Sequence, residues 1–450
     1  MNKTRIKDMT EGNPLQLIFT FALPIFLGNI FQQLYNVLDT MIAGYNLGDN
    51  ALAAIGATSA IYSLIIGMAN GMNNGYSIIV ARSYGEKNME KLRHSVGVML
   101  ILNVITALLF TLLSCIFIMP ILKLLNTPPE IIKDAYEFII IILLGITSTI
   151  LYNMEAGVLR ALGNSKTPLV FLIISLFFNL AMDLIFVVIM HGGVWSTALA
   201  TVISEVLSVI LCFIHIVKYY PELKLSKKHF HFDKELIIEM FTTGLSMGLM
   251  SSIFALGTVI LQGSINSLGK ATITAHLAAR KLDEMLMLPL STLVTANATF
   301  VGQNYGAKKI NRIREGIKKT CVLGFIWATF CVLIAYTAAP ILTKALTGTS
   351  DSYITNMAAK YLKINLPFFY VLHILLVLRT SLQGIGRKIA PLISSSIEMI
   401  GKFAAVLWLV PKLGYLGVCI VEPILWVLCT LFLLGTFFKI EKDFEKLKIS

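Results

Sequence analysis

The chain has 450 residues, of which 56% are apolar and only 14% are charged. Soluble domains carry roughly 25% charged residues, so this composition excludes a soluble multidomain enzyme. The apolar residues are instead sufficient for about twelve membrane helices of about 20 residues each. The net charge of +12 is compatible with nucleic acid binding, but Lys and Arg also gather in the cytoplasmic loops of membrane proteins.

Apolar segments bounded by basic, Gly or Pro residues predict twelve membrane-spanning helices. The predicted fold is therefore an all-α polytopic membrane protein. All six cysteines lie in the apolar runs and lack the spacing of a metal or redox motif, so we expect them to be packing residues. In chain order, the segments cover residues 14–43, 51–81, 94–122, 131–158, 168–191, 194–217, 236–266, 271–302, 316–343, 354–382, 391–410 and 415–438.

The basic residues are distributed unevenly over this pattern. If the N-terminus is cytoplasmic, most of the 37 Lys and Arg residues fall in segments on the cytoplasmic side. Orientation alone then explains the basic charge, and we expect no nucleic acid partner and both termini in the cytoplasm. Residues 1–13 are polar and the next apolar run continues past residue 38, which predicts a retained span and no cleaved signal peptide.

The chain also repeats itself at almost half its length. A shift of 221 residues places Tyr84-Gly85 on Tyr305-Gly306, and a shift of 223 places Pro168-Leu169 on Pro391-Leu392. Each half would contain six spans, an even number, so both copies enter the membrane from the same side. This is the layout of a carrier with its site between two bundles.

The repeat predicts the domain boundaries. We expect an N-terminal six-helix lobe at 1–218, a cytoplasmic linker at 219–235 and a C-terminal six-helix lobe at 236–450. The linker contains His229 and His231, which we expect to be solvated, because a metal site needs more ligands than two nearby histidines.

Polar side chains form stripes on three spans of the first half. Ionisable residues cost about 2.5–3.5 kcal/mol each at the centre of a membrane helix, so they tend to face the bundle interior and mark a pathway. Three such stripes in one bundle predict a common cavity. They consist of Asn29, Gln32, Asn36 and Asp39 with neighbouring Gln33, of Asn179 and Asp183, and of Thr197, Thr201, Glu205 and Ser208.

Two carboxylates, Asp39 and Asp183, would then share one cavity. Desolvation and like charge favour their sharing a proton or recruiting a cation, and either event could drive a transporter. The alternative is that these polar groups only join helices by hydrogen bonds, which is common for Asn and Thr in membranes. An interhelical hydrogen bond does not require a carboxylate, so the coupling interpretation is favoured for the two aspartates.

Other features suggest bending, packing and a second polar cluster. Pro24 lies inside the first span and permits a kink. Gly67, Gly71 and Gly75 repeat at four-residue steps, a pattern typical of close helix packing.

The eighth span holds charges that could neutralise one another or line a cavity or gate, and Glu398, Lys402 and Glu422 could face the same space. The residues concerned are His276, Arg280, Lys281, Asp283 and Glu284, with Met287 beside them.

Several stretches resemble the multidrug and toxic compound extrusion (MATE) family over essentially the whole chain, and most of all its bacterial DinF-like and Firmicute-type members. They are PLQLIFTFALPIFLGNIFQQLYNVLDTMIAG from Pro14, LGDNALAAIGATSAIYSL, ARSYGEKN, GVLRALGNSKTP and LPLSTLVTANATFVGQNYGA. The resemblance implies two pseudo-symmetric six-helix lobes around a central cavity in the bacterial plasma membrane. It also implies export of amphipathic, usually cationic compounds in exchange for Na+ or H+.

Residue by residue, the resemblance assigns cation or proton coupling to Asp39, Asn179, Asp183 and Thr201, and helix bending to Pro24. The NorM-like branch has further acidic residues on its seventh and tenth helices, and this sequence lacks them within the corresponding spans. We expect no cofactor, no metal other than transported Na+ at Asp39 and Asp183, and a monomer. The expected substrate cavity contains Gln32, Gln33, Asn36, Glu205, His276, Arg280, Lys281, Asp283, Glu284 and Met287.

Three other functions compete with this interpretation. A lipid-linked oligosaccharide flippase of the same superfamily would also have a two-lobe cavity, but with a more cationic wall. A membrane-embedded enzyme is disfavoured because no metal-ligand cluster, Ser-x-x-Lys dyad, phosphate-binding loop or Gly-x-Ser-x-Gly elbow occurs. A passive channel would differ from a carrier in its turnover kinetics.

Overall fold

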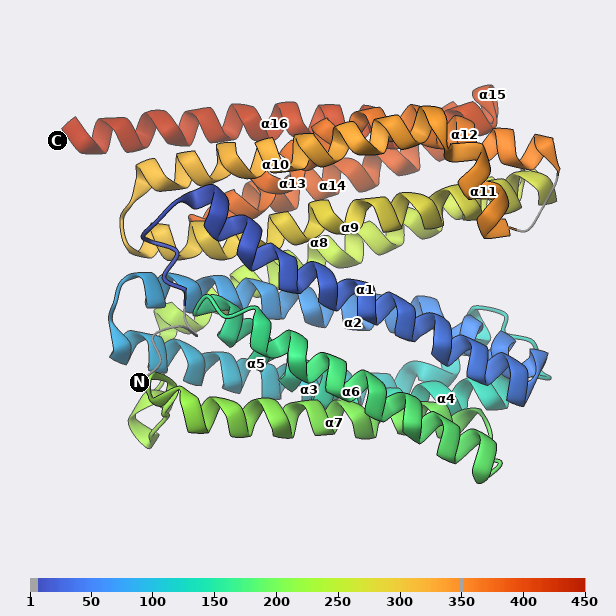
Figure 1. Cartoon of the computed structure of the whole chain (residues 1–450), viewed down its shortest axis with the longest axis horizontal. Coiled ribbons are helices and arrows are strands. Elements are labelled where there is room, and N and C mark those ends of the chain that lie inside the picture. The colour runs from blue at the N-terminus through green and yellow to red at the C-terminus, as the bar shows by residue number, and fades with distance from the viewer. Residues whose placement is uncertain (1–6, 348–350, 450) are drawn as a thin grey trace. The chain divides into compact units, whose positions relative to one another are not determined.

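The computed structural model describes residues 7–347 and 351–449, which form helices joined by short turns and contain no strand. Within each half, long helices run side by side and reverse direction at tight connections (Figure 1). Both halves thus have the all-helical architecture that the sequence predicts.

In its described residues, the first half consists of seven α-helices and a π-helical segment, followed by two short 3-10 turns. They are α1 (Pro14–Leu47), α2 (Asp49–Gly85), α3 (Met89–Leu124), α4 (Ile132–Leu144), α5 (Ile146–Ala161), α6 (Lys166–Asp183), η1 (Leu184–Ile189), α7 (Val194–Tyr219), η2 (Pro221–Leu223) and η3 (Lys227–Phe230).

The part of the second half that the structure describes has nine α-helices, a 3-10 turn and a second π-helical segment. They are α8 (Lys234–Asn266), α9 (Lys270–Gly306), α10 (Ile310–Thr337), α11 (Ala339–Thr347), α12 (Ser352–Asn365), η4 (Leu366–Phe368), α13 (Phe369–Gly384), α14 (Ile389–Ala404), η5 (Ala405–Leu409), α15 (Val410–Leu413) and α16 (Tyr415–Ile449).

The number of membrane spans agrees with the prediction. Among the described residues, 11 helices are long and apolar enough to cross a membrane, and α4 with α5 makes a twelfth span with a 43° bend. The bend falls at Gly145, where a Cβ atom would overlap the side chain of Val202 on α7. Close packing against α7 therefore accompanies the break in this span. The predicted twelve-span, all-α fold is confirmed.

The chain divides into two compact units. One contains residues up to Met9 and Leu23–Gly248, and the other contains Thr10–Ala22 and residues from Leu249 onward. The division therefore falls inside α1 and α8. The lobe boundaries that the sequence predicts come from the internal repeat and place the junction at 219–235. They stay a prediction.

The repeat is visible in the backbone of each half. Helices α2 and α9 both have 37 residues and both follow a glycine with positive φ, Gly48 at 82° and Gly269 at 96°. Lys87 and Lys308, which follow these helices at the same spacing, both have a φ of 58°. A left-handed residue is uncommon outside glycine, so its recurrence at equivalent positions supports a duplicated fold.

Both halves also contain a π-helical segment that the sequence does not predict. The segment η1 begins directly after Asp183 at the end of α6, and η5 begins directly after Ala404 at the end of α14. Short π-helical segments within α-helices are rare and occur frequently at functional sites. The end of α6, at Asp183, therefore has a backbone geometry that is common at functional sites.

Helix α2 packs closely on the part of α8 that belongs to its own unit. A Cβ atom at Gly71 would lie 2.6 Å from the Met247 carbonyl oxygen, and one at Gly75 would lie 2.6 Å from Cα of Gly244. No atom lies within 4 Å of a Cβ at Gly67. The close-packing role predicted for the glycines is thus confirmed for two of the three.

Candidate functional site

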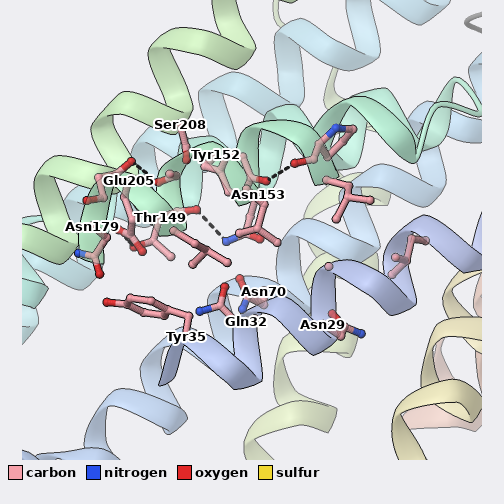
Figure 2. Close-up of a pocket in the computed structure, with 18 of the residues that line it drawn as sticks. Asn29, Gln32, Tyr35, Asn70, Thr149, Tyr152, Asn153, Asn179, Glu205 and Ser208 are labelled. Carbon is pink, nitrogen blue, oxygen red and sulfur yellow. Dashed lines mark hydrogen bonds between the residues drawn. The ribbon is translucent and has the colours of Figure 1, made fainter. Parts of the chain in front are cut away.

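The first unit encloses a polar cavity of about 470 Å³, whose walls come from α1, α2, α5, α6 and α7. Figure 2 shows that side chains from these helices point into a common space. The three predicted polar stripes contribute to one cavity, as expected. Its polar lining includes Asn29, Gln32, Tyr35, Asn36, Tyr62, Asn70, Thr149, Tyr152, Asn153, Arg160, Ser165, Ser175, Asn179, Thr201, Ser204, Glu205 and Ser208.

Glu205 is the carboxylate in the cavity wall itself. Its Oε2 atom accepts hydrogen bonds from the hydroxyl groups of Thr149 at 2.5 Å and Ser148 at 3.3 Å. Both hydroxyls lie on α5, whereas Glu205 lies on α7, so the carboxylate joins two walls of the cavity. These hydrogen bonds hold the Glu205 carboxyl group in place beside the cavity.

The predicted pair Asp39 and Asp183 is not part of the cavity lining, but it lies next to Tyr35 and Asn179, which do line the cavity and lie close together in Figure 2. Asp183 follows Asn179 by one helical turn and is fully buried. Asp39 lies one turn beyond Tyr35 on α1 and is half-buried. The two carboxyl groups and the Tyr35 hydroxyl are within electrostatic reach of one another.

Several polar atoms of this acidic group make no well-aligned hydrogen bond among the described residues, although the carboxyl groups of Asp39 and Asp183 are near enough to share a proton and the Tyr35 hydroxyl lies near Thr201. The atoms concerned are both polar atoms of the Asn179 amide, both carboxyl oxygens of Asp183, Oδ1 of Asp39 and the Tyr35 hydroxyl. Buried polar groups are usually hydrogen-bonded, and leaving one unpaired costs free energy. The set is thus prepared for a proton or a cation with oxygen ligands.

Thr201 completes this group from α7. Its hydroxyl donates to the Thr197 carbonyl oxygen of its own helix at 3.1 Å, so its oxygen lone pairs remain available. Hard cations such as Na+ and Ca2+ prefer oxygen ligands, and Asp39, Asp183, Asn179 and Thr201 all supply oxygen. The residues to which the resemblance assigns coupling therefore converge at one end of the cavity.

Local sequence explains the position of these residues. Asn179 and Asp183 are four residues apart, so they share one face of α6. A Cβ at Gly28 would lie only 3.4 Å from Leu169 and Leu172, so α1 lies close to α6. Pro24 lines the cavity one turn before this contact, where it removes a backbone hydrogen bond from α1.

Some cavity residues are not among the sequence-predicted sites. Tyr35, Tyr152 and Asn153 line the cavity, although they stand outside the stripes that periodicity picks out. Arg160 also lines it, although it falls outside the predicted span 131–158. Helix α5 continues to Ala161, so Arg160 lies in the last turn of a helix.

The three predicted cavity residues of α1 differ in whether they line the cavity. Gln32 and Asn36 line the cavity, and the Gln32 amide donates to the Asn36 side chain at 3.3 Å. Gln33 is half-exposed and is not part of the lining. Its neighbouring position on the helix turns it about 100° from Gln32, so its predicted role in the substrate cavity stays a prediction.

The second unit holds a chain of buried ion pairs. Arg379 contacts Glu398 at 2.9 Å, and Lys402 lies 3.4 Å from both Glu398 and Glu422. Arg280 continues the chain with a 3.1 Å contact to Glu422. All five side chains are at most 16% exposed. Neutralisation among charges, one of the two sequence interpretations, therefore describes this cluster.

The remaining charges of the eighth span are arranged around Arg280. Asp283 is buried 3.7 Å from it, whereas Glu284 is exposed and 3.8 Å away. Lys281 is exposed, and the buried His276 ring packs edge-on against Tyr361. Met287 packs against the apolar core. A substrate-cavity role for these residues stays a prediction.

The two halves differ at equivalent positions. Helices α6 and α14 begin 223 residues apart, which pairs Asn179 with Lys402. Helices α7 and α16 begin 221 residues apart, which pairs Thr201 with Glu422. The first half thus has neutral oxygen ligands where the second half has a salt bridge.

Comparison with known proteins agrees with this architecture. The MatE family matches residues 24–185 and again residues 245–405, which is the duplication seen in the sequence and the backbone. The chain belongs to the MatE family. The sequence resemblance to MATE transporters is therefore confirmed, and the chain is a multi-pass membrane transporter and not an enzyme.

Individual MATE relatives match over nearly the full chain. The probable multidrug resistance protein YoeA of Bacillus subtilis (strain 168) is 25% identical over 92% of this chain and 91% of its own. The multidrug export protein MepA of Staphylococcus aureus (strain N315) is 21% identical over 84% and 83%. A crystal structure of MATE in the bent conformation superimposes with a TM-score of 0.91, at 21% identity and 98% coverage of both chains.

Proposed function

We propose that this MATE transporter is a multidrug efflux antiporter that exports amphipathic cations in exchange for Na+ or H+. Two relatives named for multidrug resistance or export support the substrate class. The observation that carries the coupling proposal is the unpaired oxygen cluster of Asp39, Asn179 and Asp183 beside the cavity. An entering proton or cation would satisfy those atoms.

The proposed exchange works through competition and shape. A cation or proton at Asp39 and Asp183 removes negative charge from one end of the cavity and so weakens the binding of a cationic substrate. The same event changes the packing of α1 against α6. Pro24 allows α1 to bend, and the related structure described as bent has the same fold. Release of the coupling ion inward would restore affinity.

The chemistry of the cavity favours cationic cargo. Glu205 and Arg160 are the charged residues in the described lining, and Asp39 and Asp183 add two carboxyl groups beside it. Tyr35, Tyr62 and Tyr152 also line it, and aromatic faces attract cations. Carboxyl groups and aromatic rings in and beside the wall suit a phosphorylated lipid less well than an organic cation, which makes the flippase alternative the weaker one.

Coupling in this proposal is confined to the first half. In the second half, the Lys402 ammonium group occupies the position equivalent to Asn179 and contacts two carboxylates. A covalently attached cation there would exclude a mobile one. We further propose a bacterial plasma membrane location, cytoplasmic termini and a monomeric carrier, in keeping with the distribution of basic residues.

The test is efflux from proteoliposomes that contain the purified wild-type chain. A fluorescent organic cation is loaded, and inward Na+ and H+ gradients are imposed in separate experiments with the membrane potential clamped. The proposal predicts that one gradient accelerates efflux and that the rate saturates with cargo. Equal efflux with and without either gradient would contradict antiport.

A further inference from the structure

The connection between the two halves lies directly on α3. A Cβ atom at Gly97 would lie 2.6 Å from the His229 carbonyl oxygen, so the glycine lets the linker backbone touch the helix. The Arg93 guanidinium also donates to the Glu222 carbonyl oxygen at 2.9 Å. The linker is thus held against one face of α3, and the expectation that both of its histidines are solvated is wrong for His229, which is buried.

This contact brings three metal-ligand side chains together. His94 lies one turn before Gly97 on the same face of α3, and His231 and Asp233 follow the buried part of the linker. The imidazole rings of His94 and His231 stack at 3.9 Å with an angle of 6°. One ligand atom from each of the three side chains lies within 4.8 Å of the others.

Hydrogen bonds to backbone carbonyl groups fix the tautomer of both rings. Nδ1 of His94 lies 2.9 Å from the His229 carbonyl oxygen, and Nδ1 of His231 lies 2.8 Å from the Lys228 carbonyl oxygen. A carbonyl oxygen only accepts, so both Nδ1 atoms carry the hydrogen. The lone pair that remains for a metal ion is then on Nε2 of each ring, the arrangement that a carbonyl acceptor gives to metal-bound histidine.

The two carboxyl oxygens of Asp233 make different contacts. Its Oδ1 accepts from the Leu236 amide at 3.1 Å at the start of α8, while its Oδ2 lies 3.6 Å from Nε2 of His94. That nitrogen is buried and has no hydrogen-bond partner among the described residues. Two ligand atoms bonded to one tetrahedral zinc ion at about 2.0–2.2 Å are about 3.4 Å apart, close to this separation.

We propose that His94, His231 and Asp233 form a binding site for a divalent transition metal ion of the zinc class. Two imidazoles and one carboxylate are typical ligands for such an ion, and a water molecule would take the fourth position on the exposed side. His231 is exposed, so its ring can turn out of the stack toward the ion while His94 stays fixed. The bound metal fastens the linker and the start of α8 to α3.

Zinc titration of the full-length chain tests the proposal. The protein is purified in detergent without a histidine tag, treated with chelator and titrated with zinc chloride by calorimetry. We expect one equivalent to bind, and the affinity to fall at least tenfold in His231→Ala and in Asp233→Asn. Both changes are mild, since His231 is exposed and Asn caps a helix about as well as Asp.

His191→Asn is the matched control, because His191 is an exposed histidine with positive φ far along the chain and Asn tolerates that conformation. Its zinc affinity should equal that of the wild type. A second measurement is cleavage by trypsin at Lys227 and Lys228, which zinc should slow in the wild type and not in His231→Ala. Zinc binding of equal affinity in the wild type and both ligand variants, or no binding to the wild type, would overturn the proposal.

Discussion

The Lys402 ammonium nitrogen lies 3.4 Å from a carboxyl oxygen of Glu422, in a pair of which Lys402 is 1% and Glu422 6% exposed. The equivalent positions of the first half hold Asn179 and Thr201, beside the unpaired carboxylate of Asp183. A duplicated fold thus has opposite electrostatics at one position. The second half has a positive charge, the Lys402 ammonium group, where the first half has the neutral Asn179.

Lys402→Met should therefore expose a latent cation site in the second half. Removing one partner of a buried ion pair costs about 3–5 kcal/mol, because Glu398 and Glu422 lose a shared counter-charge. We expect a lower thermal unfolding temperature in choline chloride and partial recovery in sodium chloride. The double variant Lys402→Met/Glu422→Gln is the control, with a smaller loss and no sodium effect. If Lys402→Met unfolds at the same temperature in both salts, a latent cation site in the second half is contradicted.

Glu205→Gln should weaken the binding of cationic cargo. The change keeps side-chain size and an oxygen that can accept from Thr149, but removes the carboxyl group that can carry a negative charge. We expect the dissociation constant for a fluorescent cation to rise about tenfold, equivalent to about 1.4 kcal/mol, while a neutral analogue of similar shape binds as before. Equal weakening for both ligands would indicate a structural role for Glu205 instead.

The α2 and α8 contact should depend on individual glycines. Gly75→Ala places a Cβ against backbone atoms of α8, and overpacking of this kind costs about 1–3 kcal/mol. Gly67→Ala meets no atom within 4 Å and should be neutral or stabilising by up to about 1 kcal/mol, because Ala favours helices over Gly. Thermal unfolding in detergent compares the two. A larger loss in Gly67→Ala would refute this packing.

Pro24→Ala should change the transport rate more than the substrate affinity. Alanine restores a backbone hydrogen bond in α1 and removes the proline on which the proposed bending depends. We expect cargo binding within about twofold of the wild type, since a twofold change is only about 0.4 kcal/mol, and a turnover rate reduced several-fold. Binding measured in detergent and efflux from proteoliposomes separate these effects. Unchanged turnover would remove bending at Pro24 from the mechanism.

Much of the fold follows from the sequence, because a bilayer requires long apolar helices. The twelve spans and the internal repeat are examples, and so are the stripes that include Asn179 and Asp183. The π-helix that follows Asp183 could not be predicted, since its residues LIFVVI have the same apolar character as a regular membrane helix. Its position depends on packing within the bundle.

Tertiary contacts also explain why the positions of Arg160 and His229 differ from those predicted from the sequence. Arg160 falls outside the predicted span 131–158, because basic residues usually mark helix ends, yet α5 extends past it and brings it to the cavity. His229 is buried by a contact with α3 that no local pattern announces, although Gly97 and His94 on α3 are the signal in retrospect. Single-residue positions at helix ends depend on partners distant in sequence.

Gradient-driven transport by Asp39→Asn and Asp183→Asn tests the central claim most directly. Both variants, the wild type and Asp49→Asn, which alters an exposed aspartate at the start of α2, are reconstituted at equal density. The account predicts that the two coupling variants lose ion-driven accumulation of cargo and keep downhill cargo exchange, while Asp49→Asn matches the wild type. Full ion-driven accumulation by either coupling variant would contradict it.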